Sequence, residues 1–398
     1  MRSYRAVLAI TDVWTTLLLT ALVRIPMFSL GMVLTVHVVT TLGLSYRLAG
    51  LVTTVITIAS MISSPWRGSM VDRRGLRRTI TPSVVILVVV WSVAPWVGYL
   101  PLLALCAIGG LWTYPVYTVP RQVLIARTSL AQRRAALSLD AVSVEICYMI
   151  GPTLAIVAAT SVGTRPTIMA CTAVAALGAV GLMVRNPATA DLSQAEGPDT
   201  PQGRARWLTP TTFALLVAVC AAGFALGSLE LTTVAAMRAM GSPGAIGWVL
   251  AASALGSALG GIVYGMMPRG ASTPVLLIAM GATTGLAALA HSPWQAAVLL
   301  AVGGIFVAPT LTSSVDSLST LVPASVRGAV IGWQGSSLNA GIALAAPLVG
   351  AAIDATRWQS GFLAGGATAL VVGLAVQAVV RLARGRRHRR SAAGRPLA

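Results

Sequence analysis

Lysine is absent from this chain of 398 residues, and all 28 of its basic residues are arginine. Without lysine there is no Walker A phosphate loop, which excludes an ATP-driven pump of that kind. The three histidines, at positions 37, 291 and 388, are scattered, and none of the four cysteines lies in a CxxC pair. No metal site or disulfide framework is therefore expected. The hydrolase patterns GxSxG and HExxH are also missing, so we predict no enzyme and no cofactor.

Apolar residues make up 56% of the chain, charged residues only 10%, and the mean hydropathy is +0.82. Apolar runs long enough to cross a bilayer recur along the whole sequence. We predict an all-α integral membrane protein whose twelve transmembrane helices form two pseudo-symmetric bundles of six. The expected helices are 14–40, 48–69, 80–99, 101–124, 137–160, 164–184, 211–236, 244–267, 274–291, 294–316, 328–352 and 359–382.

The arginines set the predicted orientation. With a cytoplasmic N-terminus, 23 of the 28 fall on the inner side, which supports an even number of helices and two cytoplasmic termini. This distribution explains the net charge of +18 through membrane topology and contact with anionic lipid, so no nucleic-acid partner is expected. Arginine in place of lysine, with abundant Ala, Gly and Val, indicates a GC-rich bacterial genome and hence a bacterial inner membrane.

A polar stretch at 185–209 divides the chain into an N-terminal bundle, 1–184, and a C-terminal bundle, 210–382. Residues 383–398 form a basic cytoplasmic tail. The halves look like a repeat at an offset of about 193: Arg134 matches Arg327, and Gly109-Gly110 matches Gly303-Gly304. Parallel repeats of this kind are typical of secondary transporters.

One polar run between two apolar stretches has a specific spacing: Gly68-Ser69-Met70-Val71-Asp72-Arg73-Arg74-Gly75-Leu76-Arg77-Arg78. The first glycine permits close helix approach, the aspartate supplies a fixed negative charge, and the second glycine turns the chain. The run resembles the loop between helices two and three of the major facilitator superfamily of transporters. A plain positive-inside loop is the alternative interpretation.

That resemblance implies a conformational latch, in which Asp72 meets the N-terminal end of helix eleven near Gly328. Leu76 stands where the family usually has arginine, and Gly265 stands where the second half would need the aspartate, so the latch is expected on one side only. The latch residues are Gly68, Asp72, Arg73, Gly75, Arg77, Arg78 and Arg327.

Arg24 lies about ten residues into helix one, roughly 15 Å deep at 1.5 Å per residue. A charge at that depth needs a partner or a watery cavity. Glu145 in helix five lies at a similar depth, so we expect these two to interact, either as a structural pair or as part of a proton relay. Asp140 lies about 140° away from Glu145 around the helix and is not expected to pair with it. Arg121 is expected to lie too near the cytoplasmic end to take part.

Glu230 in helix seven and His37 in helix one occupy equivalent places in the outer third of the membrane. Both side chains titrate usefully when desolvated, which makes them candidates for proton coupling. The alternative is that they are interfacial residues that reach lipid headgroups, and we favour that alternative for His37. Further residues that could line a substrate cavity are Trp112, Tyr114, Tyr117, Tyr148, Trp333, Gln334 and Asn339.

The resemblance covers essentially the whole chain and implies a secondary transporter that works by alternating access. Arg24-Ile25-Pro26 and Tyr46-Arg47-Leu48-Ala49-Gly50 look like an actinobacterial branch associated with efflux. We therefore expect a monomeric protein that exports a small, fairly apolar organic molecule in exchange for protons. Proton-coupled uptake of a metabolite uses the same fold and is the alternative, and a receptor or scaffold without transport is a third possibility.

Overall fold

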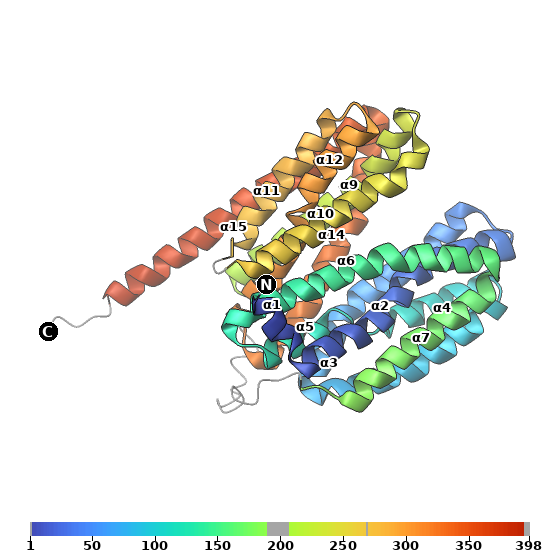
Figure 1. Ribbon diagram of the computed structural model, residues 1–398, viewed down its shortest axis with the longest axis horizontal. Helices are drawn as coiled ribbons and strands as arrows, with labels where there is room; N and C mark the ends of the chain where they lie inside the picture. The colour runs from blue at the N-terminus through green and yellow to red at the C-terminus, as the bar shows by residue number, and fades with distance from the viewer. Residues whose placement is uncertain (1, 189–206, 268–269, 394–398) are drawn as a thin grey trace. The chain divides into compact units, whose positions relative to one another are not determined.

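A computed structural model describes residues 2–188, 207–267 and 270–393 (Figure 1). All regular elements in these ranges are helical, which confirms the predicted all-α class. Most of the 185–209 linker and residues 394–398 lie outside the described residues.

The chain divides into two compact units. The first contains residues 1–199 together with 262–268 and 322–336, and the second contains the remainder. Two short segments of the sequence's second half thus pack with the first unit, which the division at the linker did not anticipate. The helices of the first half are α1 (Arg2–Leu8), α2 (Thr11–Val36), α3 (Tyr46–Val93), α4 (Tyr99–Leu111), α5 (Thr118–Arg127), α6 (Leu130–Ser161) and α7 (Thr164–Arg185).

The second half contributes seven further helices. Its last helix continues through much of the basic segment that was expected to be a tail. These helices are α9 (Pro210–Ala239), α10 (Ile246–Met266), α11 (Thr273–Leu286), α12 (Pro293–Gly304), α13 (Val307–Leu321), α14 (Arg327–Ala355) and α15 (Gln359–Ala393).

Nine helical segments of the described residues are long and apolar enough to cross a membrane, and two shorter apolar helices accompany them. One of the nine, within α3, contains two crossings, because Gly75 interrupts it with a φ of 75° and a ψ of 172°. Only glycine adopts this backbone conformation readily. The structure thus accommodates the twelve predicted crossings, and Gly75 turns the chain between the second and third.

Two crossings are broken where the sequence predicted continuous helices. Helix four is divided into α4 and α5 by an irregular stretch at 112–117, and helix ten is divided into α12 and α13 after Gly304. Pro115 lies within the first break and Pro309 in the first turn of α13, just after the second break. The two prolines are 194 residues apart, in agreement with the internal repeat. Proline removes a backbone donor and disfavours helix for the residue before it.

Small residues let the helices of the first unit approach closely. A Cβ added at Gly110 would lie 2.6 Å from the backbone oxygen of Ile56 in α3, and one at Gly178 would lie 2.8 Å from that of Leu19 in α2. Helices in lipid associate through such close packing, because apolar burial alone gives them no advantage over lipid contact. In Figure 1, α2 accordingly runs beside α6 and α7.

Candidate functional site

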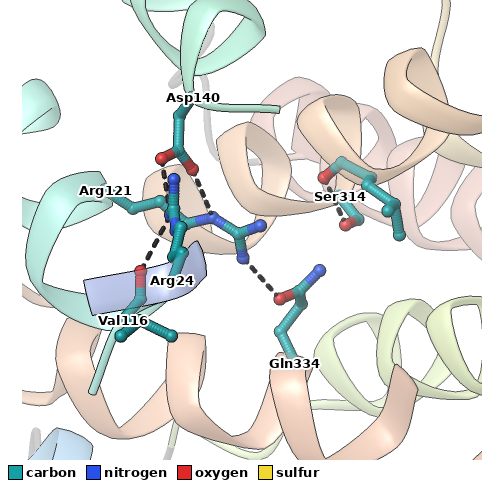
Figure 2. A network of polar contacts seen from close by, with 7 residues as sticks. Arg24, Val116, Arg121, Asp140, Ser314 and Gln334 are labelled. Atoms are coloured by element: carbon teal, nitrogen blue, oxygen red, sulfur yellow. Dashed lines mark hydrogen bonds and ion pairs between the residues drawn. The ribbon is translucent and has the colours of Figure 1, made fainter. Parts of the chain in front are cut away.

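Three charged side chains from three helices of the first unit meet in its interior (Figure 2). Arg24 Nη2 of α2 lies 2.7 Å from Asp140 Oδ1 of α6, and Arg121 Nε of α5 lies 3.1 Å from Asp140 Oδ2. The side chains of Arg24 and Asp140 are 0% and 1% exposed. One carboxylate therefore bridges two guanidinium groups, with one oxygen for each.

The break in helix four supplies a further ligand for Arg24. In a continuous helix the carbonyl of Val116 would accept a hydrogen bond from the backbone four residues later, but that residue is Pro120, which has no N–H. Arg24 Nη2 donates to the Val116 oxygen at 2.8 Å instead. A proline thus creates a free carbonyl deep in the unit, and a buried arginine satisfies it.

Arg121 also links α5 to the beginning of α14. Its Nη1 donates to Gln334 Oε1 at 2.8 Å, and both residues belong to the first unit. The aromatic ring of Tyr117 lies against both arginines, with its centroid 5.8 Å from Arg24 Cζ and 5.3 Å from Arg121 Cζ. The ring face therefore adds a weak cation–π attraction to each.

The network leaves some donors unused. Nε and Nη1 of Arg24 are buried and have no hydrogen-bond partner within the described part of the chain. It is costly to leave the buried donors of a charged group unpaired. A hydrogen-bond acceptor placed beside these two nitrogens would therefore be stabilised.

The expected partnership of Arg24 and Glu145 is corrected, because the ion pair of Arg24 is with Asp140. The error came from the helix start. Helix five was expected to begin at 137, which placed Glu145 at the depth of Arg24, but α6 begins at Leu130. Asp140 is thus ten residues in, about 15 Å at 1.5 Å per residue.

The exclusion of Arg121 was also wrong, because its guanidinium is part of this buried cluster. Proline at position 120 beside a polar pair was the available signal, since proline in a crossing implies a free carbonyl that needs a donor. Glu145 lies five residues beyond Asp140 and is half-buried, close enough to Tyr117 to act on it electrostatically.

His37 and Glu230 lie elsewhere. His37 is completely buried in a π-helical turn, with Nδ1 2.8 Å from Thr164 Oγ1 of α7, so it does not reach headgroups as expected. Glu230 is half-buried in α9 of the second unit. The neighbouring Gly223 and Gly227 do not border open space, because a Cβ at either would collide with α14.

Only two of the predicted cavity aromatics, Tyr117 and Tyr148, are gathered, through the Phe28 ring that neighbours both. Tyr148 is 48% exposed and lies 5.7 Å from Phe28 between ring centroids, whereas Trp112 packs against Trp66. Tyr114 borders an apolar cavity of about 80 Å³ inside the first unit. Of the remaining predicted residues, Trp333 is 45% exposed and Asn339 is half-buried.

The loop between the second and third crossings makes the contact that the predicted latch requires. Asp72 accepts hydrogen bonds from the backbone N–H groups of Gly328 and Ala329, both at 2.9 Å, and from Gln122 Nε2 at 2.6 Å. The helix N-terminus favours the negative charge of Asp72. A Cβ at Gly68 would lie 2.1 Å from the Gly328 oxygen, so only glycine fits there.

Burial raises the pKa of the Asp72 carboxyl to about 6, although the backbone donors of Ala329 and Gly328, the amide of Gln122 and the charge of Arg327 oppose the shift. Arg327 itself is 8% exposed. The other arginines of the loop point into solvent, which fits an orienting role; the predicted latch members among them are Arg73, Arg77 and Arg78.

A second contact occupies the equivalent place in the repeat. Gly265 lies against Tyr4 and Ser138, and Arg134 Nη1 donates to the Met267 oxygen at 2.7 Å. At this contact the cation Arg134 lies at the C-terminal end of α10. At the first contact the anion Asp72 lies at the N-terminal end of α14. Each charge is opposite in sign to the helix end that it contacts. The latch was expected on one side, but the sequence had no aspartate to reveal this second contact.

No group of three potential metal ligands occurs among the residues that the structure describes. The sequence matches the family model described as Major Facilitator Superfamily over residues 16–241 and 213–397. No curated protein is significantly similar to the chain.

Solved transporter structures share the fold. The human organic anion transporter MFSD10 (TETRAN) is 17% identical with a TM-score of 0.72, covering 94% of this chain and 99% of its own. FucP in the outward conformation is 14% identical, with the same TM-score and coverage. The proton:xylose symporter XylE, bound to 6-bromo-6-deoxy-D-glucose, is 12% identical with a TM-score of 0.66, covering 92% and 95%.

Proposed function

Because the chain belongs to the Major Facilitator Superfamily, whose members are secondary transporters working by alternating access, we propose that it exports a small organic molecule in exchange for protons. The proposed setting is a bacterial inner membrane, with a monomeric protein and both termini in the cytoplasm.

The buried cluster of Arg24, Arg121 and Asp140 carries this proposal. Ionised side chains at membrane depth are expensive, and they normally mark substrate or ion pathways. A receptor or scaffold would gain nothing from two guanidinium groups held in its interior. A transporter gains a fixed electrostatic site on which cargo and protons can act.

Two carboxyl groups are proposed as proton carriers. Asp140 accepts hydrogen bonds from two arginines and is only 1% exposed, so both of its carboxylate oxygens are committed to these contacts. Glu145 lies one and a half turns further along α6 and is half-buried, so it can exchange protons more readily. Glu230 holds a comparable half-buried position in α9. Asp140 then serves as the fixed countercharge of the arginines.

Export rather than uptake is supported by the resemblance of Arg24-Ile25-Pro26 and Tyr46–Gly50 to the efflux-associated branch. The names of the structural neighbours do not select a cargo, because an organic anion and a sugar differ chemically and the identities are low. Uptake of a metabolite by the same fold is the competing function.

We also propose that Asp72 and its partners act as the inner latch. The two backbone hydrogen bonds from α14 and the close approach at Gly68 support this role, because both must be broken before the beginning of α14 can separate from α3. The exposed arginines of the loop are then orienting charges rather than direct contacts.

Transport in proteoliposomes tests the proposal. Vesicles of uniform inside-out orientation would receive naphthalene-1-sulfonate, 1-naphthamide or 1-naphthylmethylamine, with and without an acidic interior. Export coupled to proton entry predicts uptake of at least one compound above the level of empty vesicles, increased by the acidic interior. Accumulation only under the opposite gradient would support uptake instead, and absence of carrier-dependent flux for every compound would refute the proposal.

A further inference from the structure

We propose that the outer edge of the Arg121 guanidinium binds the oxyanion head of the cargo, which is therefore an organic anion. This inference rests on the proposed transport function and names its substrate class. In the present conformation the amide oxygen of Gln334 occupies part of that edge.

The use of the Arg121 nitrogens identifies the open edge. Nε is engaged by Asp140 at 3.1 Å, and Nη1 donates to Gln334. Nη2 has no hydrogen bond within the described residues, and Figure 2 shows it beside Nη1 on the side away from Asp140. The pair Nη1 and Nη2 is a fork that matches the two oxygens of a carboxylate or sulfonate.

The inner edge of Arg121 is held in place. Asp140 fixes its Nε, Tyr117 packs against the guanidinium, and the side chain retains only 7% exposure. A fork held in this way loses little freedom when it binds a ligand, so its geometry favours an oxyanion that offers two oxygens over a neutral polar group.

Gln334 is a replaceable occupant. Its amide oxygen is a neutral acceptor, whereas hydrogen bonds to an ionised acceptor are roughly twice as strong. An anion can therefore displace Gln334 from Arg121 when the beginning of α14 moves. A neutral amide ligand would form a hydrogen bond no stronger than the one that Gln334 already forms. A cation is repelled by both arginines.

The surrounding charges agree with this assignment. The ionisable groups near Tyr117 are Arg24, Arg121, Asp140 and Glu145. With Glu145 protonated, two positive charges face one negative charge, and Nε and Nη1 of Arg24 have no acceptor within the described part of the chain. An anion restores the balance in an interior where an uncompensated charge is costly.

Aromatic groups beside the cluster indicate the body of the anion. The Phe28 ring lies 6.4 Å from that of Tyr117 and 5.7 Å from that of Tyr148, between centroids. Phe28 is half-buried and Tyr148 is 48% exposed. Aromatic rings beside the charged cluster favour a flat apolar body attached to the oxyanion.

Binding to the purified full-length protein, measured by isothermal titration calorimetry, tests this proposal with 1-naphthoate, 1-naphthamide and 1-naphthylmethylamine. We expect 1-naphthoate to bind at least tenfold more tightly than the other two. Equal affinity for the amide, or no detectable binding of the carboxylate, would overturn the proposal.

Two substitutions at one position locate the site. Gln334→Glu tethers a carboxylate to Arg121 and should weaken 1-naphthoate binding at least tenfold, whereas Gln334→Leu removes the competing acceptor and should preserve or tighten it. Arg121→Lys keeps the charge but loses the fork, and it should weaken binding. Unchanged affinity in Gln334→Glu, with thermal unfolding like that of the parent, would place the anion elsewhere and contradict the assignment.

The transport assay separates this inference from the function on which it rests. Carrier-dependent flux of 1-naphthamide but not of naphthalene-1-sulfonate would support a transporter and refute the anion site. If Gln334→Glu weakens 1-naphthoate binding but no compound shows carrier-dependent flux, the site is supported and the proposed transport is refuted.

Discussion

Substitution of Gly68 by alanine should open the proposed latch between α3 and α14. The added Cβ would lie 2.1 Å from the Gly328 oxygen and 2.7 Å from its carbonyl carbon. Both are backbone atoms, so no side-chain rotation can relieve the collision. Since ordinary van der Waals contact begins at 3.4 Å, the beginning of α14 must retreat by about 1.3 Å.

This displacement is large enough to break the hydrogen bonds of the latch. The two bonds from Gly328 and Ala329 to Asp72 are 2.9 Å long, and a retreat along their direction takes them beyond hydrogen-bond distance. Bonds to a charged group contribute about 1.5–3 kcal/mol each, and water recovers part of that loss. A net loss of about 2 kcal/mol would shift the equilibrium about 30-fold towards the open state.

Two other glycines of α14, Gly335 and Gly332, provide matched controls. A Cβ at Gly335 would meet only Ser64 Oγ at 3.6 Å, so Gly335→Ala should leave the latch intact. A Cβ at Gly332 would lie 2.4 Å from the Ser64 oxygen, so Gly332→Ala should resemble Gly68→Ala. The three variants differ from their parents by one methyl group each.

A cysteine at Ser336 can report opening. Ser336 is 5% exposed and donates to the Met61 oxygen at 2.6 Å, so Ser336→Cys in a chain without its native cysteines should react slowly with maleimide in inside-out vesicles. Gly68→Ala should raise the rate at least tenfold, and Gly335→Ala should not change it. Equal rates for Gly68→Ala and its parent would refute the assignment of Gly68 as the contact that closes the latch.

Three further predictions concern the buried ion pair, the pH dependence of the latch and the membrane topology. Arg24→Ala or Asp140→Ala should each lower the free energy of unfolding by about 3–5 kcal/mol, which a lower thermal midpoint would report. The double variant should lose less than the sum of the two single losses. Strictly additive losses would mean that the two side chains do not interact. Because the pKa of Asp72 is about 6 when latched and near its ordinary 3.8 when released, the latched state should be about fourfold more favourable at pH 5.5 than at pH 7.5. Protonation thus holds the latch as pH falls through 6. The rate of Ser336→Cys labelling, expressed relative to that of the same cysteine in denatured protein at each pH, should slow accordingly. A relative pH effect that persists in Asp72→Asn would contradict this. Single cysteines at positions 163 and 240, but not 195, should react from outside intact cells, and labelling at 195 would overturn the helix count.

Much of the architecture could be predicted from physical constraints that act locally. Backbone groups in lipid must pair within the helix, and arginine loops fix the direction of each crossing, so composition alone indicates helical crossings and favours twelve. The contact of Asp72 with α14 was implied by the resemblance of the Gly68–Arg78 run to the loop of the family, and not by these constraints. Gly75 confirms the expected turn with its positive φ.

The partners inside the membrane could not be predicted, because they depend on where each helix begins and breaks. A start placed seven residues late in α6 selected Glu145 instead of Asp140. The effect of Pro120, which leaves the carbonyl of Val116 without its helical donor and open to Arg24, was overlooked. The depth of Arg121 was misjudged for a similar reason, since α5 is a separate short helix and not the end of a straight crossing.

Simultaneous measurement of proton and cargo movement in proteoliposomes tests the account most directly. Naphthalene-1-sulfonate stays ionised, so its accumulation requires the carrier, and a pH indicator inside the vesicles reports protons. The wild-type protein should couple the two fluxes, whereas Glu145→Gln, which mimics a permanently protonated carrier, should exchange cargo without proton movement. Asp354→Asn, at an exposed carboxylate, should behave as wild type. If Glu145→Gln and Glu230→Gln both concentrate cargo against its gradient as well as the wild type does, proton coupling through these residues is contradicted.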